Sequence, residues 1–218
     1  MNFTFLDKYF GYYLKGAEIT IVVAFFGVLF GTILGLGITL LRRSKIKIIK
    51  FIGTAYVEFV RGTPLLVQIY IIYIGLPNLI GMDLPDIIVG IIALALNAAA
   101  YVSEILRAMI EAVDKGQMEA GLALGLSYGK VMRYIILPQA IRNILPALGN
   151  EFITLLKETS AGAYIGILEL TKASDIIASR TYDYFFPLII TALIYLIMTL
   201  GLSKLVNVME RRLSNARS

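Results

Sequence analysis

The sequence has 218 residues, of which 58% are hydrophobic and only 16% are charged, and its mean hydropathy is +0.80. A soluble domain usually carries about 25% charged residues, so this composition excludes an ordinary water-soluble protein. The chain has no cysteine and no histidine, which excludes disulfides and thiolate metal sites and removes the commonest general base. We therefore expect an all-α polytopic membrane protein without a metal site.

Five apolar stretches approach or exceed the roughly 20 residues that a helix needs to cross the hydrocarbon. Each is predicted to be a transmembrane helix, and together they make the chain a single transmembrane domain over 1–218. Gly62 and Pro64 interrupt the second stretch, where they should bend the helix and free backbone groups in a cavity. The fourth stretch is the least apolar. The predicted spans are about 19–41, 51–76, 87–109, 144–167 and 185–208.

In the first stretch, glycine recurs every four residues, at Gly27, Gly31 and Gly35. Small residues at this spacing let two helix backbones approach closely. The pattern therefore predicts that this span packs tightly against another helix.

Lysine and arginine concentrate in the connections after the first, third and fifth stretches. The other side of the predicted spans has only Lys8, Lys15, Lys172 and Arg180. Because basic residues mark cytoplasmic connections, we expect the amino terminus outside and the carboxyl terminus in the cytoplasm. The net charge of +5 is then explained by these connections, and no nucleic-acid partner is predicted.

The longest cytoplasmic connection, about residues 110–142, contains a predicted short helix over 117–124. Gly125 is placed to end this helix, because glycine takes the left-handed C′ conformation without strain. A second amphipathic turn follows, and Leu137-Pro138 lead into the fourth span. Two short helices with a glycine corner below the membrane suit docking into a groove of a partner protein.

This loop resembles the signature of ATP-binding-cassette importer permeases through Glu119-Ala120-Gly121, Gly125 and Ile135-x-Leu137-Pro138. The family signature is Glu-Ala-Ala, so Gly121 departs from it at one position. Residues 58–68 (EFVRGTPLLVQ) and 157–160 (KETS) resemble the branch that takes up polar amino acids. The resemblance covers nearly the whole chain and implies a location in a bacterial cytoplasmic membrane.

The resemblance implies that the loop is a coupling helix, which docks into a cytoplasmic ATPase subunit through Glu119, Ala120, Gly121 and Gly125. It also implies a second permease copy, identical or paralogous, and an extracytoplasmic solute-binding protein. ATP and Mg²⁺ would be bound by the ATPase subunits. This chain is expected to be no enzyme and to bind no cofactor. The nearest match to a phosphate-binding loop, 125–130, has the wrong spacing, and Val131 stands where a hydroxyl is required.

Polar residues at bilayer depth are expensive and mark candidate functional sites. Asn97, Tyr101 and Glu104 share one face of the third span, and Glu151, Thr154 and Glu158 share one face of the fourth. The two faces are predicted to oppose each other or a water-filled path. For Asn97, interhelical hydrogen bonding is the alternative to substrate contact. The predicted substrate-binding residues are Asn97, Glu151, Glu58, Tyr101, Thr154 and Thr159.

In the second span, Glu58 and Arg61 lie three residues apart and are predicted to form an ion pair, either at a gate or as a purely structural contact. Carboxylates along the predicted path outnumber the cations Arg61 and Lys157. This excess favours a basic amino acid such as arginine, lysine or histidine as the substrate. The resulting hypothesis is an importer permease with alternating access driven by a separate ATPase. A channel or ion-coupled secondary transporter is the alternative, and it would transport without a partner.

Overall fold

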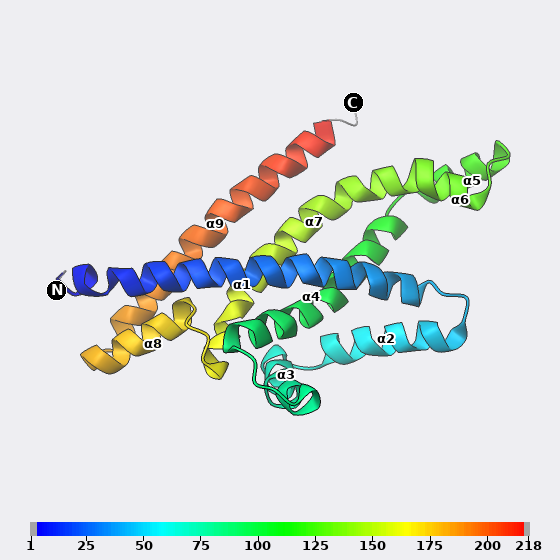
Figure 1. Cartoon of the computed structure of the whole chain (residues 1–218). Helices are drawn as coiled ribbons and strands as arrows, with labels where there is room; N and C mark the ends of the chain where they lie inside the picture. The colour runs from blue at the N-terminus through cyan, green and yellow to red at the C-terminus, as the bar shows by residue number, and fades with distance from the viewer. Residues whose placement is uncertain (1–3, 216–218) are drawn as a thin grey trace.

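The computed structural model describes residues 4–215, with side chains over 8–213. The described residues form helices and turns and contain no strand, which confirms the predicted all-α class (Figure 1). A π-helical turn, Met132–Ile136, joins α6 to α7, and a 3₁₀ turn, Thr159–Ile165, follows α7. The helices are α1 (Thr4–Arg42), α2 (Lys47–Gly62), α3 (Leu65–Ile80), α4 (Asp86–Glu111), α5 (Lys115–Ala123), α6 (Tyr128–Val131), α7 (Leu137–Glu158), α8 (Leu170–Thr181) and α9 (Phe185–Asn215).

Three of the described helices are long and apolar enough to cross a membrane: α1 over Lys8–Arg42, α4, and α9 over Phe185–Leu213. The predicted second span is not one continuous helix, because α2 and α3 meet at an angle of 114°. Together this pair has the length and composition of a fourth, broken span. The remaining expected span, the fourth (about 144–167), corresponds to α7, which is 22 residues long but carries several charges. The count of five spans therefore stays a prediction.

The helix at the predicted fourth span, about 144–167, runs from Leu137 to Glu158 and is followed by the 3₁₀ turn Thr159–Ile165. It therefore begins before the end expected for the coupling loop, about residue 142. The bounds of the membrane span itself stay a prediction. The position of Pro138 suits the start of this helix, because it lies in the first turn of α7. There the missing N–H of a proline removes no hydrogen bond of the helix, and its fixed φ favours the helix.

The core forms where α1 packs along α4. A methyl group added at Gly31 would lie 2.6 Å from Ala98 Cβ, and one at Gly35 would lie 2.8 Å from Val102 Cβ. Val23, Leu94, Ala98 and Leu155 form one buried cluster at this contact. The repeated glycines thus allow the close helix packing that the sequence predicts, and α4 becomes the central helix of the chain.

Different helices lie at the two ends of the molecule (Figure 1). One end carries α8, whose first turn is capped by the fully buried carboxylate of Glu169. Tyr195 of α9 donates its hydroxyl proton to the same carboxylate at 2.8 Å. The other end carries the α1–α2 connection together with α5 and α6. By the predicted orientation, this second end is the cytoplasmic one.

Candidate functional site: the broken helix, the polar face of α7 and the coupling segment

The break between α2 and α3 is built around Pro64. In an unbroken helix, the Val60 carbonyl would accept from the amide of residue 64, but proline has no N–H. Gln68, buried on the first turn of α3, supplies the missing donor. Its Nε2 donates to the Val60 carbonyl at 2.7 Å and to the Thr63 carbonyl at 3.0 Å. The Val60 and Thr63 carbonyls are therefore bound within the chain rather than exposed in a cavity, unlike the freed backbone groups that the sequence predicts.

Asn97 belongs to the same network. It is 3% exposed, and its Nδ2 donates to Gln68 Oε1 at 2.8 Å. This contact is the interhelical hydrogen bond that the sequence offers as the alternative role. The Asn97 Oδ1 atom is buried without a hydrogen-bond partner among the described residues. Asn97 thus braces the broken helix against α4, and its contact with substrate stays a prediction.

Glu104 is the centre of an ion-pair network that joins three helices. Its carboxylate lies 2.6 Å from Arg42 of α1, 3.8 Å from Arg61 of α2 and 2.8 Å from Arg107 on its own helix. The Arg61 guanidinium also lies 5.8 Å from the ring centroid of Tyr101. Glu104 and Tyr101 therefore lie beside basic residues of α1, α2 and α4, and the prediction that their face of α4 opposes the polar face of α7 or a water-filled path stays a prediction.

The predicted ion pair between Glu58 and Arg61 does not form. Among the described residues, Glu58 is exposed and has no salt bridge, and Arg61 approaches Glu104 instead. Arg61 lies in the last turn of α2, immediately before the break, so its direction is set by how α2 packs against α4. A spacing of three residues makes a pair possible, but it does not decide between a local and a tertiary partner.

The acidic residues of α7, unlike Glu104 of α4, form no salt bridge with the described residues. Glu151 and Glu158 are half-buried and make no salt bridge with the described residues, while Thr154 is exposed. Thr159 is buried and donates its hydroxyl to the Leu156 carbonyl at 2.8 Å, so this hydroxyl already has a structural role. Of the predicted substrate residues on and after α7, Glu151 retains a carboxylate without a cationic partner.

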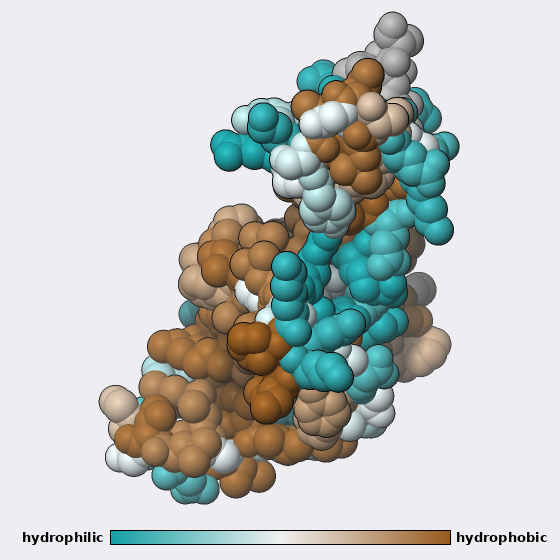
Figure 2. All heavy atoms as spheres, turned by 90° about the vertical axis from the view of Figure 1, so that its right-hand side faces the viewer, coloured by the Kyte–Doolittle hydropathy of each residue, from teal (hydrophilic) through white to brown (hydrophobic). Residues whose placement is uncertain are grey.

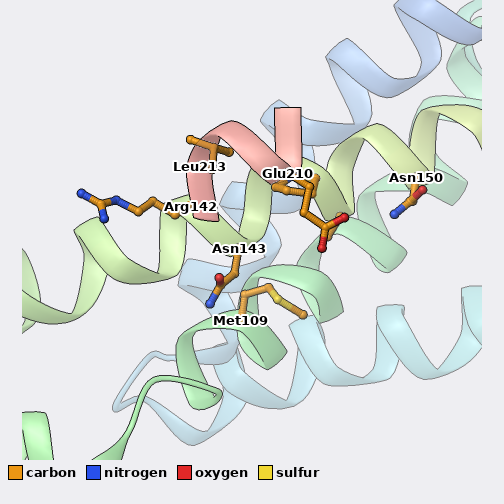
Figure 3. A pocket seen from close by; sticks show the side chains of 8 residues that line it. Met109, Arg142, Asn143, Asn150, Glu210 and Leu213 are labelled. Atoms are coloured by element: carbon orange, nitrogen blue, oxygen red, sulfur yellow. The ribbon is translucent and has the colours of Figure 1, made fainter. Parts of the chain in front are cut away.

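A polar cavity of about 380 Å³ lies beside α7, between that helix and the ends of α4 and α9 (Figure 3). Asn143 and Asn150 line it from α7, and Glu210 lines it from α9, with its carboxylate directed toward the cavity. Asn150 is the neighbour of Glu151 in sequence. The cavity shows that polar side chains continue along α7 toward the end that carries the coupling segment.

The predicted coupling segment, residues 115–131, consists of α5, a corner at Gly125 and α6. Asp114 caps α5 by accepting from the Gly116 amide at 2.6 Å. Gly125 ends the helix with φ +79°, as predicted, and its amide donates to the Leu122 carbonyl at 3.0 Å. The Leu126 amide donates to the Gly121 carbonyl at 3.2 Å, which completes a Schellman cap.

The departure from the family signature at Gly121 has a packing reason. Gly121 is buried, and a methyl group there would lie 2.7 Å from Val131 Cγ2. The absence of a side chain at Gly121 therefore leaves room for Val131, the last residue of α6. Glu119, Ala120 and Gly125 are all exposed, so a partner protein can reach these three positions.

Sequence reasoning missed Gln68 and Glu169 as organising residues. For Gln68 a signal was present, since it lies four residues after Pro64, whose missing N–H leaves a carbonyl in need of a donor. For Glu169 the distances to Tyr195 depend on how α8 packs against α9. No local spacing predicts that contact.

Comparison with known proteins places these features in a family. Residues 14–215 match the model of the family described as the binding-protein-dependent transport system inner membrane component. The chain is 42% identical over 202 residues to the arginine transport system permease protein ArtQ of Bacillus subtilis, covering 93% of this chain and 92% of that protein. It is 41% identical over 199 residues to the putative glutamine transport system permease protein GlnP of Rickettsia bellii, covering 91% of each.

Two solved structures of ABC transporters are also similar to this chain. A crystal structure described as an amino acid ABC transporter with histidines matches with a TM-score of 0.92 and 48% identity, covering 97% of this chain and 99% of that one. An inward-facing structure of the MetNI methionine ABC transporter matches with a TM-score of 0.70 at 19% identity, covering 94% of this chain and 95% of that one. The second match shows a shared fold only.

Proposed function

Because this chain belongs to the family of inner membrane components of binding-protein-dependent transport systems, we propose that it forms the translocation path for a basic amino acid and is driven by a separate ATPase. Its role as a permease subunit of an amino-acid ABC importer follows from the family and from relatives named as such permeases. We further propose which amino acid it transports, which partner subunits it binds, how it is oriented in the membrane and which residues contact the ATPase.

The observation that carries the proposal is the exposed coupling segment. Glu119, Ala120 and Gly125 are accessible at one end of the molecule, on a helix and corner whose shape is fixed by the Schellman cap. A rigid projecting helix can transmit the movement of a partner, as helix-in-groove recognition requires. The proposed partners are two ATPase subunits that bind ATP and Mg²⁺, a second permease copy and an extracytoplasmic binding protein.

In the proposed mechanism, closure of the ATPase pair moves the coupling segments and opens the path outward, and hydrolysis returns it inward. The amino terminus lies outside and the carboxyl terminus in the cytoplasm, which places Glu119 beside the ATPase. Pull-down of the ATPase with this chain in mild detergent tests the coupling. Gly125→Asp and Glu119→Lys should each reduce co-purification or uncouple hydrolysis from uptake.

The matched control is Glu18→Lys, which makes the same charge change at an exposed position on α1, toward the opposite end of the molecule. It should leave the pull-down unchanged. If both charge reversals behave alike, the coupling assignment is wrong. Uptake by the purified chain without any ATPase would instead favour the channel or ion-coupled alternative.

A basic substrate is supported by Glu151 and Glu158 of α7, which form no salt bridge with the described residues, and by the arginine permease among the relatives. The glutamine permease among the relatives makes glutamine the competing substrate. Among the predicted contact residues, Glu151 is proposed to bind the cationic side chain, with Glu58, Tyr101, Thr154 and Thr159 as further contacts and Asn97 holding α3 against α4.

Uptake of radiolabelled arginine and glutamine into vesicles with the assembled importer separates these substrates. Glu151→Gln should reduce arginine uptake by about 30-fold, because losing one partner of a desolvated charge pair costs about 2 kcal/mol or more, while any glutamine uptake changes little. Glu18→Gln serves as the matched control. If Glu151→Gln leaves arginine uptake unchanged, the acidic-site proposal is wrong, although the permease assignment stands.

A further inference from the structure

A second cavity, of about 320 Å³, lies where α1 ends, α2 begins and α4 ends. Its charged lining consists of Arg42, Arg43, Lys50, Arg107 and a single carboxylate, Glu111. Figure 2 looks at the end of the molecule that carries the α1–α2 connection and shows hydrophilic side chains gathered there beside hydrophobic flanks. This basic pocket, as we call it, is separate from the cavity beside α7.

The positive charge of the basic pocket is only partly neutralised. Arg42 is paired with Glu104, and Arg107 is shared between Glu104 and Glu111. Arg43 donates to the neutral hydroxyl of Tyr128 at 3.3 Å. Neither Arg43 nor Lys50 has a carboxylate within salt-bridge distance among the described residues. Two cations are therefore available for an anion from outside the chain.

Two hydroxyl groups lie beside these cations. Ser103 is fully buried, lines the pocket and accepts from Arg42 Nη1 at 3.3 Å. The Thr39 hydroxyl lies 3.3 Å from that of Ser103 and donates to the Gly35 carbonyl at 2.7 Å. Arginine forks together with hydroxyl groups form the usual protein environment of a phosphate group. The arginine side chains and hydroxyl groups of the pocket thus suit a phosphate group.

The exposed side chains beside the basic pocket indicate whether its phosphate belongs to a lipid or to a soluble anion. Leu40 at the end of α1 is 71% exposed, and on the first turns of α2 Ile48 and Phe51 are each 71% exposed and Ile52 is 56% exposed. An apolar surface beside a basic headgroup site is what a phospholipid needs, whereas a soluble anion would gain nothing from it. Basic pockets between transmembrane helices at the membrane surface bind anionic headgroups in this way.

We propose that this pocket binds the headgroup phosphate of an anionic phospholipid in the adjacent leaflet, with Arg43 and Lys50 as the main ligands and the acyl chains along Ile48 and Phe51. The lipid would hold the start of α2 at the membrane surface. Since Glu104 links Arg42 to Arg61 before the α2–α3 break, the lipid would also fix the basic end of the network that reaches the broken helix.

The test measures phospholipid retained by the assembled importer in mixed micelles, titrated with phosphatidylglycerol or phosphatidylcholine. Near an anionic leaflet each lysine or arginine contributes about fivefold in affinity. Lys50→Gln should therefore weaken phosphatidylglycerol binding about fivefold, and Arg43→Gln/Lys50→Gln about 30-fold. Phosphatidylcholine binding should not change. Lys50→Gln leaves the contact between Arg43 and Tyr128 intact, so it separates charge loss from disturbance of that contact.

The matched control is Lys15→Gln/Arg180→Gln, which removes the same two side-chain types at the opposite end, where Arg180 also donates to a tyrosine hydroxyl, that of Tyr12. Equal losses in pocket and control variants would overturn the proposal. Displacement of the bound phosphatidylglycerol by inorganic phosphate would show a soluble-anion site and overturn the lipid assignment. Loss of the ATPase subunits with unchanged lipid retention would make the pocket a protein contact instead.

Discussion

Gln68 should be the residue on which the broken helix depends, because it supplies a donor that Pro64 cannot. In Gln68→Leu, the Val60 carbonyl loses a buried partner at 2.7 Å and the Thr63 carbonyl loses a partly buried one at 3.0 Å. Asn97 Nδ2 also loses its buried acceptor at 2.8 Å. A buried donor or acceptor left without a partner costs about 1–3 kcal/mol. With the lower value for each of these three groups, the expected loss in free energy of unfolding is about 3 kcal/mol.

A loss of about 3 kcal/mol changes the unfolding equilibrium constant roughly 150-fold, which SDS titration followed by far-ultraviolet circular dichroism can resolve. The control is Asn78→Leu on the same helix, because Asn78 is exposed and its amide only donates to the Ile74 carbonyl of its own helix. We expect this control to stay within about 0.5 kcal/mol of the parent. If the two variants lose equal stability, Gln68 does not replace the missing proline donor.

Two packing predictions rest on single glycines. Gly31→Val should destabilise the chain by about 3 kcal/mol, since its Cβ would lie 2.6 Å from Ala98 and overpacking costs about 1–3 kcal/mol. Gly37→Val on the same helix meets nothing within 4 Å and should be neutral in the same SDS titration. Gly121→Ala should loosen the coupling segment, measured as a roughly tenfold faster tryptic cleavage there, corresponding to about 1.4 kcal/mol. Adding Val131→Ala should restore the slow cleavage, and its failure to do so would reject the proposed contact.

Features fixed by local rules could be predicted from the sequence. The glycine spacing in α1 indicates close packing whatever helix is opposite, and Gly125 ends α5 because its left-handed φ is a property of glycine itself. The helical class follows from composition, because only helices and closed barrels satisfy every backbone group in lipid. These predictions needed no knowledge of tertiary contacts.

Predictions that required a tertiary partner were less successful. The spacing of Glu58 and Arg61 allows a pair, yet Arg61 lies 3.8 Å from Glu104, a contact that depends on how α2 packs against α4. For Asn97 the sequence left substrate contact and an interhelical hydrogen bond open, and only the structure shows that Gln68 lies close enough to bond it. A sequence pattern identifies the polar residue, whereas its partner depends on how helices cross.

The polar groups of the described chain divide into two sets with different consequences. Gln68 and Glu104 bond to side chains within the chain, and so does the Asn97 side-chain nitrogen. Glu151 and Glu158 form no salt bridge with the described residues. A charge that faces lipid at the centre of a span costs about 2.5–3.5 kcal/mol on insertion scales. The exposed face of α7 is therefore unsuited to lipid and requires either water or another protein against it. A second permease copy apposed along α7 would supply both, because two such faces would enclose a polar path between them.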